Sequence, residues 1–139
     1  MSKSFFRTVT VLAASLGSLA LAGCDSFGPE EPAGPGAIFV DLRSPNGDEG
    51  AAVFEIESPE GLGEITSLGG WLYQEDLGEK IRVAAILTTP GDIQFQVRAD
   101  NVRDLPVIKV IQVAGPDNQL RSLEGYRVDL FQMADRRTP

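Results

Sequence analysis

Few residues in this chain could perform covalent chemistry. The 139 residues include one cysteine, Cys24, and no histidine, so the usual general base, the usual zinc ligand and the base of a catalytic triad are all missing. A Ser-Lys mechanism would depend on Lys80 or Lys109, and neither lies in a Ser-x-x-Lys spacing. The segment Gly61-Leu62-Gly63 lacks the third glycine of a phosphate-binding loop. The sequence therefore predicts a protein that is not an enzyme and that holds no cofactor.

Carboxylates are more plentiful, with 20 Asp and Glu against 12 Lys and Arg. A two-acid glycosidase would need a deep cleft to fix its carboxylates, and a domain of about a hundred residues offers little structure for one. Oxygen ligands for calcium occur in two turns, Asn46, Asp48 and Glu49 in the first and Asp117 with Asn118 in the second. Neither turn has the regular spacing of an EF-hand loop. Ordinary turn chemistry is the favoured interpretation, and no metal site is predicted.

The single thiol lies at the end of an apolar segment. Lys3 and Arg7 precede an apolar run from about residue 8 to residue 20, which is the order of a secretory signal peptide. The four residues that follow are Leu21, Ala22, Gly23 and Cys24. They resemble the lipobox of bacterial lipoproteins. The resemblance implies that a peptidase cleaves before Cys24 and that its sulfur carries a diacylglycerol, so that residues 1–23 are a signal peptide.

An uncleaved transmembrane helix is the alternative for this segment. Its apolar run of roughly 15 residues would measure about 22 Å as a helix, against roughly 30 Å of membrane hydrocarbon. Ser15, Gly17 and Ser18 also interrupt the run. A signal peptide therefore fits the segment better.

The charge of the chain limits its partners. Its formal net charge is −8, and removal of residues 1–23, which carry two bases and no acid, would leave −10. Nucleic acid is not an expected partner, because phosphate binding relies on clustered Lys and Arg. Anionic lipid headgroups would also repel an acidic protein, so we expect the membrane to hold it through the acyl chains on Cys24. The predicted location is the bacterial cell envelope, periplasmic or surface-exposed.

Asp25 bears on which membrane holds the protein. An aspartate directly after the lipidated cysteine resembles the inner-membrane retention signal of enteric bacteria. That signal differs between bacterial lineages, so both the inner and the outer membrane stay open as locations.

Changes of composition divide the rest of the chain. Residues 24–36 hold the cysteine and a stretch rich in proline, glycine and acid, which predicts a flexible, extended tether. Strand-like alternation occupies residues 37–133, a length that suits one domain. Residues 134–139 are expected to form a disordered C-terminal tail.

Alternation of apolar and polar residues with a period of two indicates strands throughout this domain. Ile81 and Val83, for example, share one face, and Lys80 and Arg82 share the other. Turn-forming residues separate segments at 37–43, 51–57, 71–73, 81–87, 93–99, 107–114 and 126–131, with pieces that form at most a short strand near 64–68 and 119–123. The predicted fold is all-β, an antiparallel β-sandwich of seven to eight strands.

Turn chemistry predicts how some of these strands pair. Asn46-Gly47 readily takes the positive φ angles of a tight hairpin, so residues 37–43 are expected to pair with residues 51–57. A second hairpin is expected to join residues 81–87 to residues 93–99. The segment 107–114 is apolar at both parities apart from two positions, which predicts a central strand.

Part of the domain resembles secreted sandwich modules of bacteria. The similarity to cohesin-like modules covers the opening strand at 37–43, the turn Ser44-Pro45-Asn46-Gly47 and the strand Gly50-Ala51-Ala52-Val53-Phe54-Glu55-Ile56. The likeness implies a sandwich architecture. The two cysteines that flank a tryptophan in immunoglobulin domains are missing. "Ig-like" therefore describes the expected architecture alone.

Trp71 and Tyr73 have the same strand parity, so their side chains are expected on one face. If exposed, they could stack on sugar rings or on a partner protein. A sandwich core also needs aromatic residues, and core packing is the favoured interpretation. The leading functional hypothesis is a non-enzymatic structural or protein-interaction module with an envelope protein as partner. The alternative is a carbohydrate-binding module that uses Trp71 and Tyr73.

Overall fold

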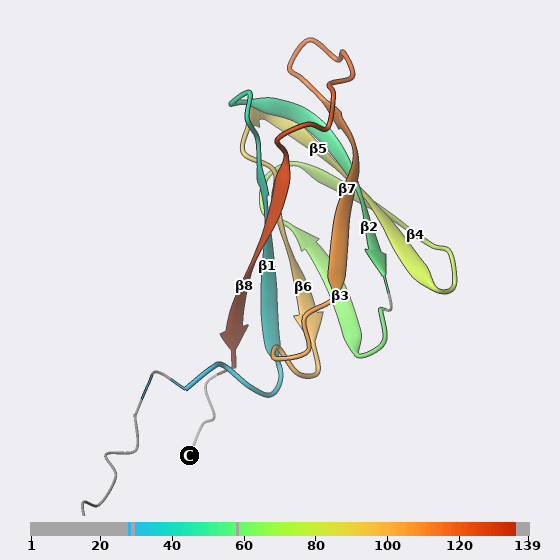
Figure 1. The fold of residues 1–139 in the computed structure, drawn as a ribbon. Helices are drawn as coiled ribbons and strands as arrows, with labels where there is room; N and C mark the ends of the chain where they lie inside the picture. The colour runs from blue at the N-terminus through green and yellow to red at the C-terminus, as the bar shows by residue number, and fades with distance from the viewer. Residues whose placement is uncertain (1–27, 29, 58, 136–139) are drawn as a thin grey trace, which may run out of the picture. The chain divides into compact units, whose positions relative to one another are not determined.

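The computed structural model describes residue 28, residues 30–57 and residues 59–135. The predicted signal peptide, the lipobox and residues 24–27 and 29 of the predicted tether lie outside the described residues. Eight strands occupy the compact unit that begins at Glu31, and no helix occurs among the described residues (Figure 1). The strands are β1 (Gly36–Arg43), β2 (Glu49–Glu57), β3 (Leu62–Ser67), β4 (Trp71–Asp76), β5 (Lys80–Gly91), β6 (Gln94–Ala99), β7 (Val107–Ala114) and β8 (Arg127–Ala134).

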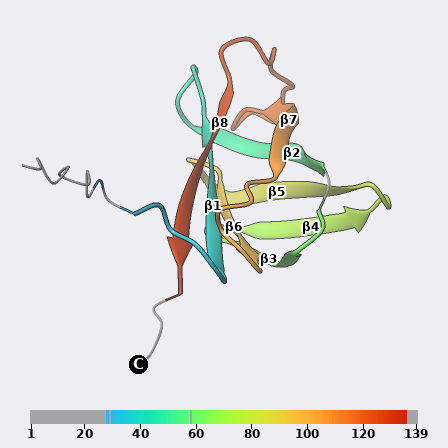
Figure 2. The same cartoon turned by 60° about the horizontal axis from the view of Figure 1, so that its bottom comes forward.

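The eight strands form two sheets of four strands each. Sheet A has the order β3-β6-β1-β8, and sheet B has the order β4-β5-β2-β7. Every strand runs antiparallel to the strands beside it. The two sheets face each other across one core (Figure 2). The predicted all-β antiparallel sandwich is confirmed.

The core fills the space between the sheets because each strand directs alternate side chains inward. Its main cluster draws on both sheets and consists of Val40, Leu42, Ala52, Phe54, Ile56, Ile65, Val83, Ala85, Ile93, Phe95, Val97 and Val113. The rings of Phe54 in sheet B and Phe95 in sheet A meet edge to face, with centroids 5.1 Å apart and planes at 66°. The alternation in the sequence therefore identifies the inward face of these strands.

The two predicted hairpins are wrong. β1 pairs with β6 and β8 in sheet A, whereas β2 pairs with β5 and β7 in sheet B, so the turn after β1 carries the chain across the core. The connection through Asp92 and Ile93 does the same between β5 and β6. Ile93 is buried, and its carbonyl accepts a hydrogen bond from the amide of Leu42 (3.0 Å). A tight turn reverses the chain, but it does not decide whether the next strand lies beside the last one or opposite it.

Within the described strands, β4 and β5 are the one consecutive pair that lies side by side. Their turn contains Gly78 with φ 86°, a left-handed value that favours glycine. The amide of Gly78 donates to the carboxylate of Asp76 (2.8 Å), and the amide of Leu77 donates to the carbonyl of Lys80 (2.9 Å). β4 therefore continues to Asp76, beyond the predicted segment 71–73.

β7 is an edge strand and not the predicted central one. It lies at the end of sheet B and pairs with β2. Val107 and Ile111 on this strand are exposed, so apolar residues at both parities do not here indicate burial on both faces. The predicted strand at 119–123 reduces to a single bridge between Leu120 and Ala114.

The first and last strands of the sandwich lie side by side. β1 begins at Gly36 and β8 ends at Ala134, each one residue beyond the predicted domain, and these two residues are paired. The carbonyl of Pro35 accepts a hydrogen bond from the amide of Asp135 (2.8 Å). A Cβ atom at Gly36 would lie 2.1 Å from the carbonyl oxygen of Met133, so this close approach requires glycine.

Candidate functional site

The predicted lipid anchor lies outside the described residues, which begin after Leu21, Ala22, Gly23 and Cys24. In the part of the chain that the structure describes, no helix is long and apolar enough to cross a bilayer. Lipid attachment at Cys24 stays a prediction from the sequence. The surfaces of the sandwich are where binding geometry can be described.

Trp71 and Tyr73 lie on the outer face of sheet B. They alternate along β4 with Leu72, which packs against the core, so the aromatic pair points away from it. Trp71 is 62% exposed and Tyr73 is 61% exposed. Core packing, the interpretation that the sequence favoured, is therefore wrong for both residues.

The register of sheet B continues this exposed surface across neighbouring strands. Two rows of paired residues cross β4, β5 and β2, the first being Trp71, Ile86 and Ala51 and the second Tyr73, Ala84 and Val53. Side chains paired in this way have Cβ atoms about 4.5–5.5 Å apart. The six residues therefore form one continuous apolar surface, which we call the aromatic face.

A shallow hollow borders the aromatic face on the side of β7. Its volume is about 140 Å³, and its lining residues are Ala51, Ala52, Val53, Gln112, Ala114 and Leu120. Leu120 is 67% exposed and is bridged to Ala114. Between the two aromatic rings at one margin of the sheet and Leu120 at the other, the surface consists of Ile86, Ala84, Ala51 and Val53.

The remaining part of the same outer face is charged. Its next row consists of Glu75, Arg82, Glu55 and Lys109. Glu55 accepts hydrogen bonds from Lys80 (2.7 Å) and Arg82 (2.9 Å), and these bonds hold the pKa of its carboxyl below the usual value. Lys109 forms an ion pair with Glu57. The outer face of sheet B is therefore divided into an aromatic part and an ion-paired part.

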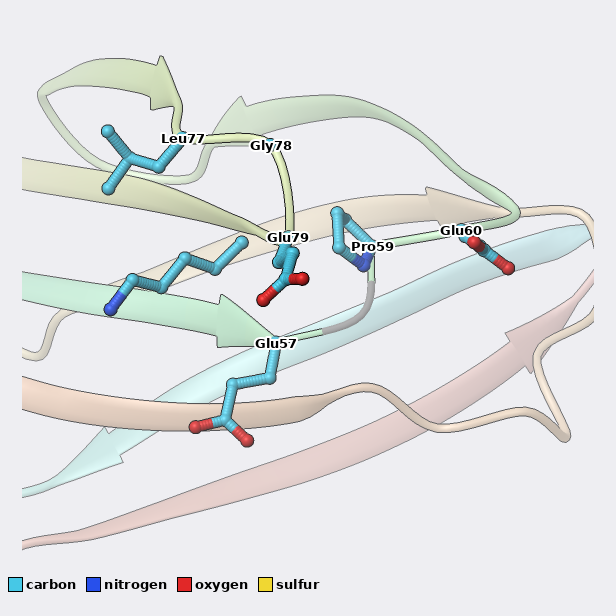
Figure 3. A pocket seen from close by; sticks show the side chains of 7 residues that line it. Glu57, Pro59, Glu60, Leu77, Gly78 and Glu79 are labelled. Atoms are coloured by element: carbon cyan, nitrogen blue, oxygen red, sulfur yellow. The ribbon is translucent and has the colours of Figure 1, made fainter.

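A hollow rich in acid lies at the end of the charged part. It measures about 820 Å³ and is lined by Glu57, Pro59, Glu60, Leu77, Gly78, Glu79 and Lys80. Figure 3 shows that its carboxylates come from the end of β2, from the chain after it and from the β4–β5 turn. Glu57 is paired with Lys109, whereas the ion pairs among the described residues include neither Glu60 nor Glu79. We call this feature the acidic hollow.

Glu49 is buried, although it follows a turn-forming segment. Its side chain is fully enclosed, and its Oε1 accepts hydrogen bonds from Ser44, Arg121 (3.0 Å) and Tyr126. The hydroxyl of Tyr126 also accepts a hydrogen bond from the side-chain amide (Nδ2) of Asn46 (2.9 Å). This network joins the β1–β2 turn to the segment before β8, and it therefore links the two sheets at one end of the sandwich.

The side chains named as calcium candidates do not converge on a common site. Glu49 and Asn46 belong to the network around Tyr126, and Asp48 is exposed. In the second turn, the carboxylate of Asp117 accepts a hydrogen bond from the amide of Gln119 (3.0 Å). Among the described residues, no group of three or more Asp, Glu, His or Cys is placed to hold a metal ion.

The outer face of sheet A carries a second group of exposed apolar residues. Phe131 and Met133 of β8 are 50% and 60% exposed, and Leu68 after β3 is also exposed. With Phe39 and Gln94 they line a hollow of about 280 Å³. Each outer face of the sandwich thus has one apolar region.

The fold and the aromatic face define a β-sandwich with an exposed apolar surface on sheet B. Comparisons of the chain with protein families, with curated proteins and with solved structures found no match. The six residues of the aromatic face are aromatic or aliphatic, with no nucleophile beside a base, so the chemistry they offer is noncovalent contact.

Sequence reasoning placed Trp71 and Tyr73 together but missed the rest of the aromatic face. A signal for it was present in β5, where Ala84 and Ile86 are apolar at the same parity as the charged Arg82. Single apolar residues on a surface are ordinary, but a contiguous group of them that extends over several strands is typical of a surface that another molecule covers.

Proposed function

We propose that this protein is a bacterial envelope lipoprotein, anchored through acyl chains on Cys24, whose sandwich is a non-enzymatic protein-interaction module. The observation that carries the interaction role is the aromatic face. Trp71 and Tyr73 are both more than three-fifths exposed, and they continue into an apolar surface three strands wide. The likeness of residues 21–24 to a lipobox supports the anchor, and an envelope protein is the proposed partner.

Burial of the aromatic face supplies most of the binding free energy in this proposal. Trp and Tyr bury large areas at interfaces and are enriched among residues whose truncation costs about 2 kcal/mol or more. Ala84, Ala51 and Val53 offer a low floor against which side chains of the partner can pack. The neighbouring ion-paired row contributes orientation more than affinity, because exposed charge pairs contribute only about 0–1 kcal/mol each.

Site-specific photocrosslinking in living cells tests the interaction role. A photoreactive amino acid at position 73 should capture a defined envelope protein, and Trp71→Ala should abolish that capture. The same amino acid at Glu64, an exposed position in β3 of sheet A, is the control and should not capture it. Capture of the same proteins from both positions, or of none from position 73, would show that the interaction role is wrong.

Detergent partition tests the anchor. The wild-type protein should enter the detergent phase and incorporate labelled fatty acid, and Cys24→Ala should do neither, because the thiol is the attachment atom. Ser26→Ala, two residues away, is the matched control and should behave as the wild type. A wild-type protein that stays in the aqueous phase contradicts the anchor without bearing on the aromatic face.

A carbohydrate-binding module is the second candidate function, and it uses the same aromatic residues. Side chains two positions apart on a strand stand about 7 Å apart, so Trp71 and Tyr73 could both contact one sugar chain. Gln112, which shares a row with Tyr73 through β5 and β2, offers an amide for hydrogen bonds. Binding to a glycan array that is lost with Trp71→Ala would favour this function over protein interaction.

A further inference from the structure

The backbone of β4 has a strand partner on one side only. β4 is the end strand of sheet B and pairs with β5. In an edge strand, alternate residues direct their N–H and C=O groups away from the sheet, where they form a template for another extended chain. The backbone hydrogen bonds of the described turns and loops do not involve residues 71–76. The outer side of β4 is therefore open to pairing.

Two of the four edge strands carry a feature that hinders pairing, because the registers of β3 and β7 with their neighbours each contain a shift. β4 and β8 pair with their neighbours in unbroken register, and each has two charged residues at one end. Of these two strands, β4 is the one that borders the aromatic face. The strand contains no proline, and Trp71–Gln74 carry no charge.

Charge beside β4 is concentrated at one end. Glu75 and Asp76 end the strand, and Glu79 follows in the turn. Glu79 and Glu60 line the acidic hollow (Figure 3). The C-terminal end of β4 is therefore anionic, whereas its N-terminal end carries Trp71.

We propose that a partner protein adds an extended segment to β4, antiparallel to it, with basic side chains in the first half of the segment and apolar side chains in the second. Antiparallel pairing continues the arrangement of sheet B. In this orientation the first residues of the segment pass Glu75 and Asp76 at the end of β4, and the later residues reach the level of Trp71 and Tyr73. The inference rests on the interaction role proposed above and specifies the chemistry of the partner.

An added strand would extend each row of the aromatic face by one residue. Its outward side chains, at every second position, would lie about 4.5–5.5 Å from those of Trp71 and Tyr73 at their Cβ atoms. Backbone hydrogen bonds along the edge provide affinity, and these alternate side chains provide specificity. The basic half of the segment raises the rate of association and makes that rate sensitive to salt, because exposed charges act mainly through long-range attraction.

Selection from a displayed library of random decapeptides against the full chain in detergent micelles tests the composition of the segment. We expect enriched peptides to carry Lys or Arg in their first half and alternating β-branched or aromatic residues in their second half. Enrichment of acidic peptides, or of none, would overturn the proposal.

Charge neutralisation tests the orientation with one synthetic peptide from that selection. Glu75→Gln combined with Asp76→Asn should weaken its binding roughly tenfold at low salt, as expected for two exposed charge pairs. The control is the pair Glu64→Gln and Glu124→Gln, which removes the same charge from exposed positions outside β4 and its turn. Equal weakening by both pairs would contradict the proposed orientation.

Hydrogen bonding between the backbones of the peptide and β4 can be tested directly. N-methylation of the peptide at alternate positions should abolish binding, whereas N-methylation at the intervening positions should not. Alternate amides of β4 should also gain protection from hydrogen exchange when the peptide binds. Tolerance of N-methylation at every position, with no gain of protection in β4, would show that strand addition is wrong.

The experiments can disprove strand addition at β4 and the binding role of the aromatic face independently of each other. If Trp71→Ala weakens the peptide while N-methylation has no effect, the partner lies on the aromatic face and strand addition is wrong. If N-methylation weakens binding at every second position of the peptide while Trp71→Ala has no effect, the peptide pairs with the edge of β4. The role proposed for the aromatic face is then wrong.

Discussion

The outer faces of the two sheets both expose apolar side chains, but their apolar regions differ in width. On sheet B the apolar rows extend from β4 across β5 to β2, and the first row reaches Ala114 in β7. On sheet A, Phe39 in β1 pairs with Phe131 in β8, but its neighbour in β6 is Gln96. The apolar region of sheet A is therefore interrupted after two strands.

Charge separates the two faces further. On sheet A, ion pairs border the apolar region on both sides, with Arg43 and Asp129 (2.9 Å) at one and Arg98 and Asp135 (2.6 Å) at the other. On sheet B the charged residues are gathered beyond one end of the aromatic face. A partner can cover an uninterrupted apolar surface without removing ion pairs from water, which is costly. Continuity, more than the presence of exposed aromatic rings, is thus what favours sheet B as the docking face.

The largest expected effect on stability comes from a substitution in the core between the two sheets. Phe54→Ala should lower the free energy of unfolding by about 3–5 kcal/mol, since a large buried aromatic side chain is lost. Phe131→Ala, on the outer face of sheet A, should change it by about 1 kcal/mol or less, because half of that side chain is exposed. Urea denaturation followed by circular dichroism measures both. Similar losses for the two variants would contradict the division into core and surface.

The next effect separates the two faces. Trp71→Ala combined with Tyr73→Ala should weaken partner binding by about 2–4 kcal/mol, while the free energy of unfolding changes by less than about 1 kcal/mol. The matched pair on sheet A, Phe131→Ala with Met133→Ala, should leave binding within about 0.5 kcal/mol of the wild type. Titration calorimetry with the captured partner measures this difference. A larger loss from the sheet A pair would move the docking surface to the other face.

A smaller effect is expected at the network that joins the sheets. Glu49→Gln should lower the free energy of unfolding by about 1–3 kcal/mol, because it weakens the buried partner of Arg121. Tyr126→Phe removes one hydroxyl from the same network and should cost about 1 kcal/mol. In a double-mutant cycle the two losses should add to more than the loss of the double variant, because both side chains act through one contact. Strict additivity would show that they act independently.

The smallest expected effect is the response of each face to acid. Hydrogen bonds from Lys80 and Arg82 lower the pKa of Glu55 from its ordinary 4.5, and a hydrogen bond from Arg98 lowers that of Asp135 from its ordinary 3.8. A lowered pKa adds stability that is fully present above the ordinary value and is lost as the pH falls through the folded-state value. Sheet B should therefore begin to lose its ion-pair contribution at a higher pH than sheet A.

Urea midpoints measured from pH 6 downward test this order. Glu55→Gln should flatten the pH dependence that begins near the ordinary 4.5, and Asp135→Asn should flatten the part that begins near 3.8. Identical pH profiles for wild type and Glu55→Gln would show that the ion pairs of Glu55 do not contribute to folding.

The inward face of most strands could be predicted, because burial depends only on the parity of each strand. Val40, Phe54 and Phe95 lie in the core as their alternation indicates. The pairing of the strands could not be predicted in this way. The turn at Asn46-Gly47 is compatible both with a hairpin and with a crossing between sheets, and the choice depends on strands much later in the chain.

The candidate site was predictable only in part, for the same reason. Parity placed Trp71 and Tyr73 on one face, but whether that face is inner or outer depends on how β4 joins the rest of the sandwich. Glu49 offered no local signal at all. Its partner Tyr126 is 77 positions away, so an acidic residue next to a turn was indistinguishable from a solvated one.

The pairing of β1 also has a consequence for how the chain folds. β1 is the first strand, yet Gly36 pairs with Ala99 on one side and with Ala134 on the other. Folds dominated by such distant pairings form in milliseconds to seconds, more slowly than folds built from local contacts. A nascent chain that lacks β8 leaves one whole side of β1 unpaired. The sheet that contains β1 can therefore be completed only after the last strand of the domain is present.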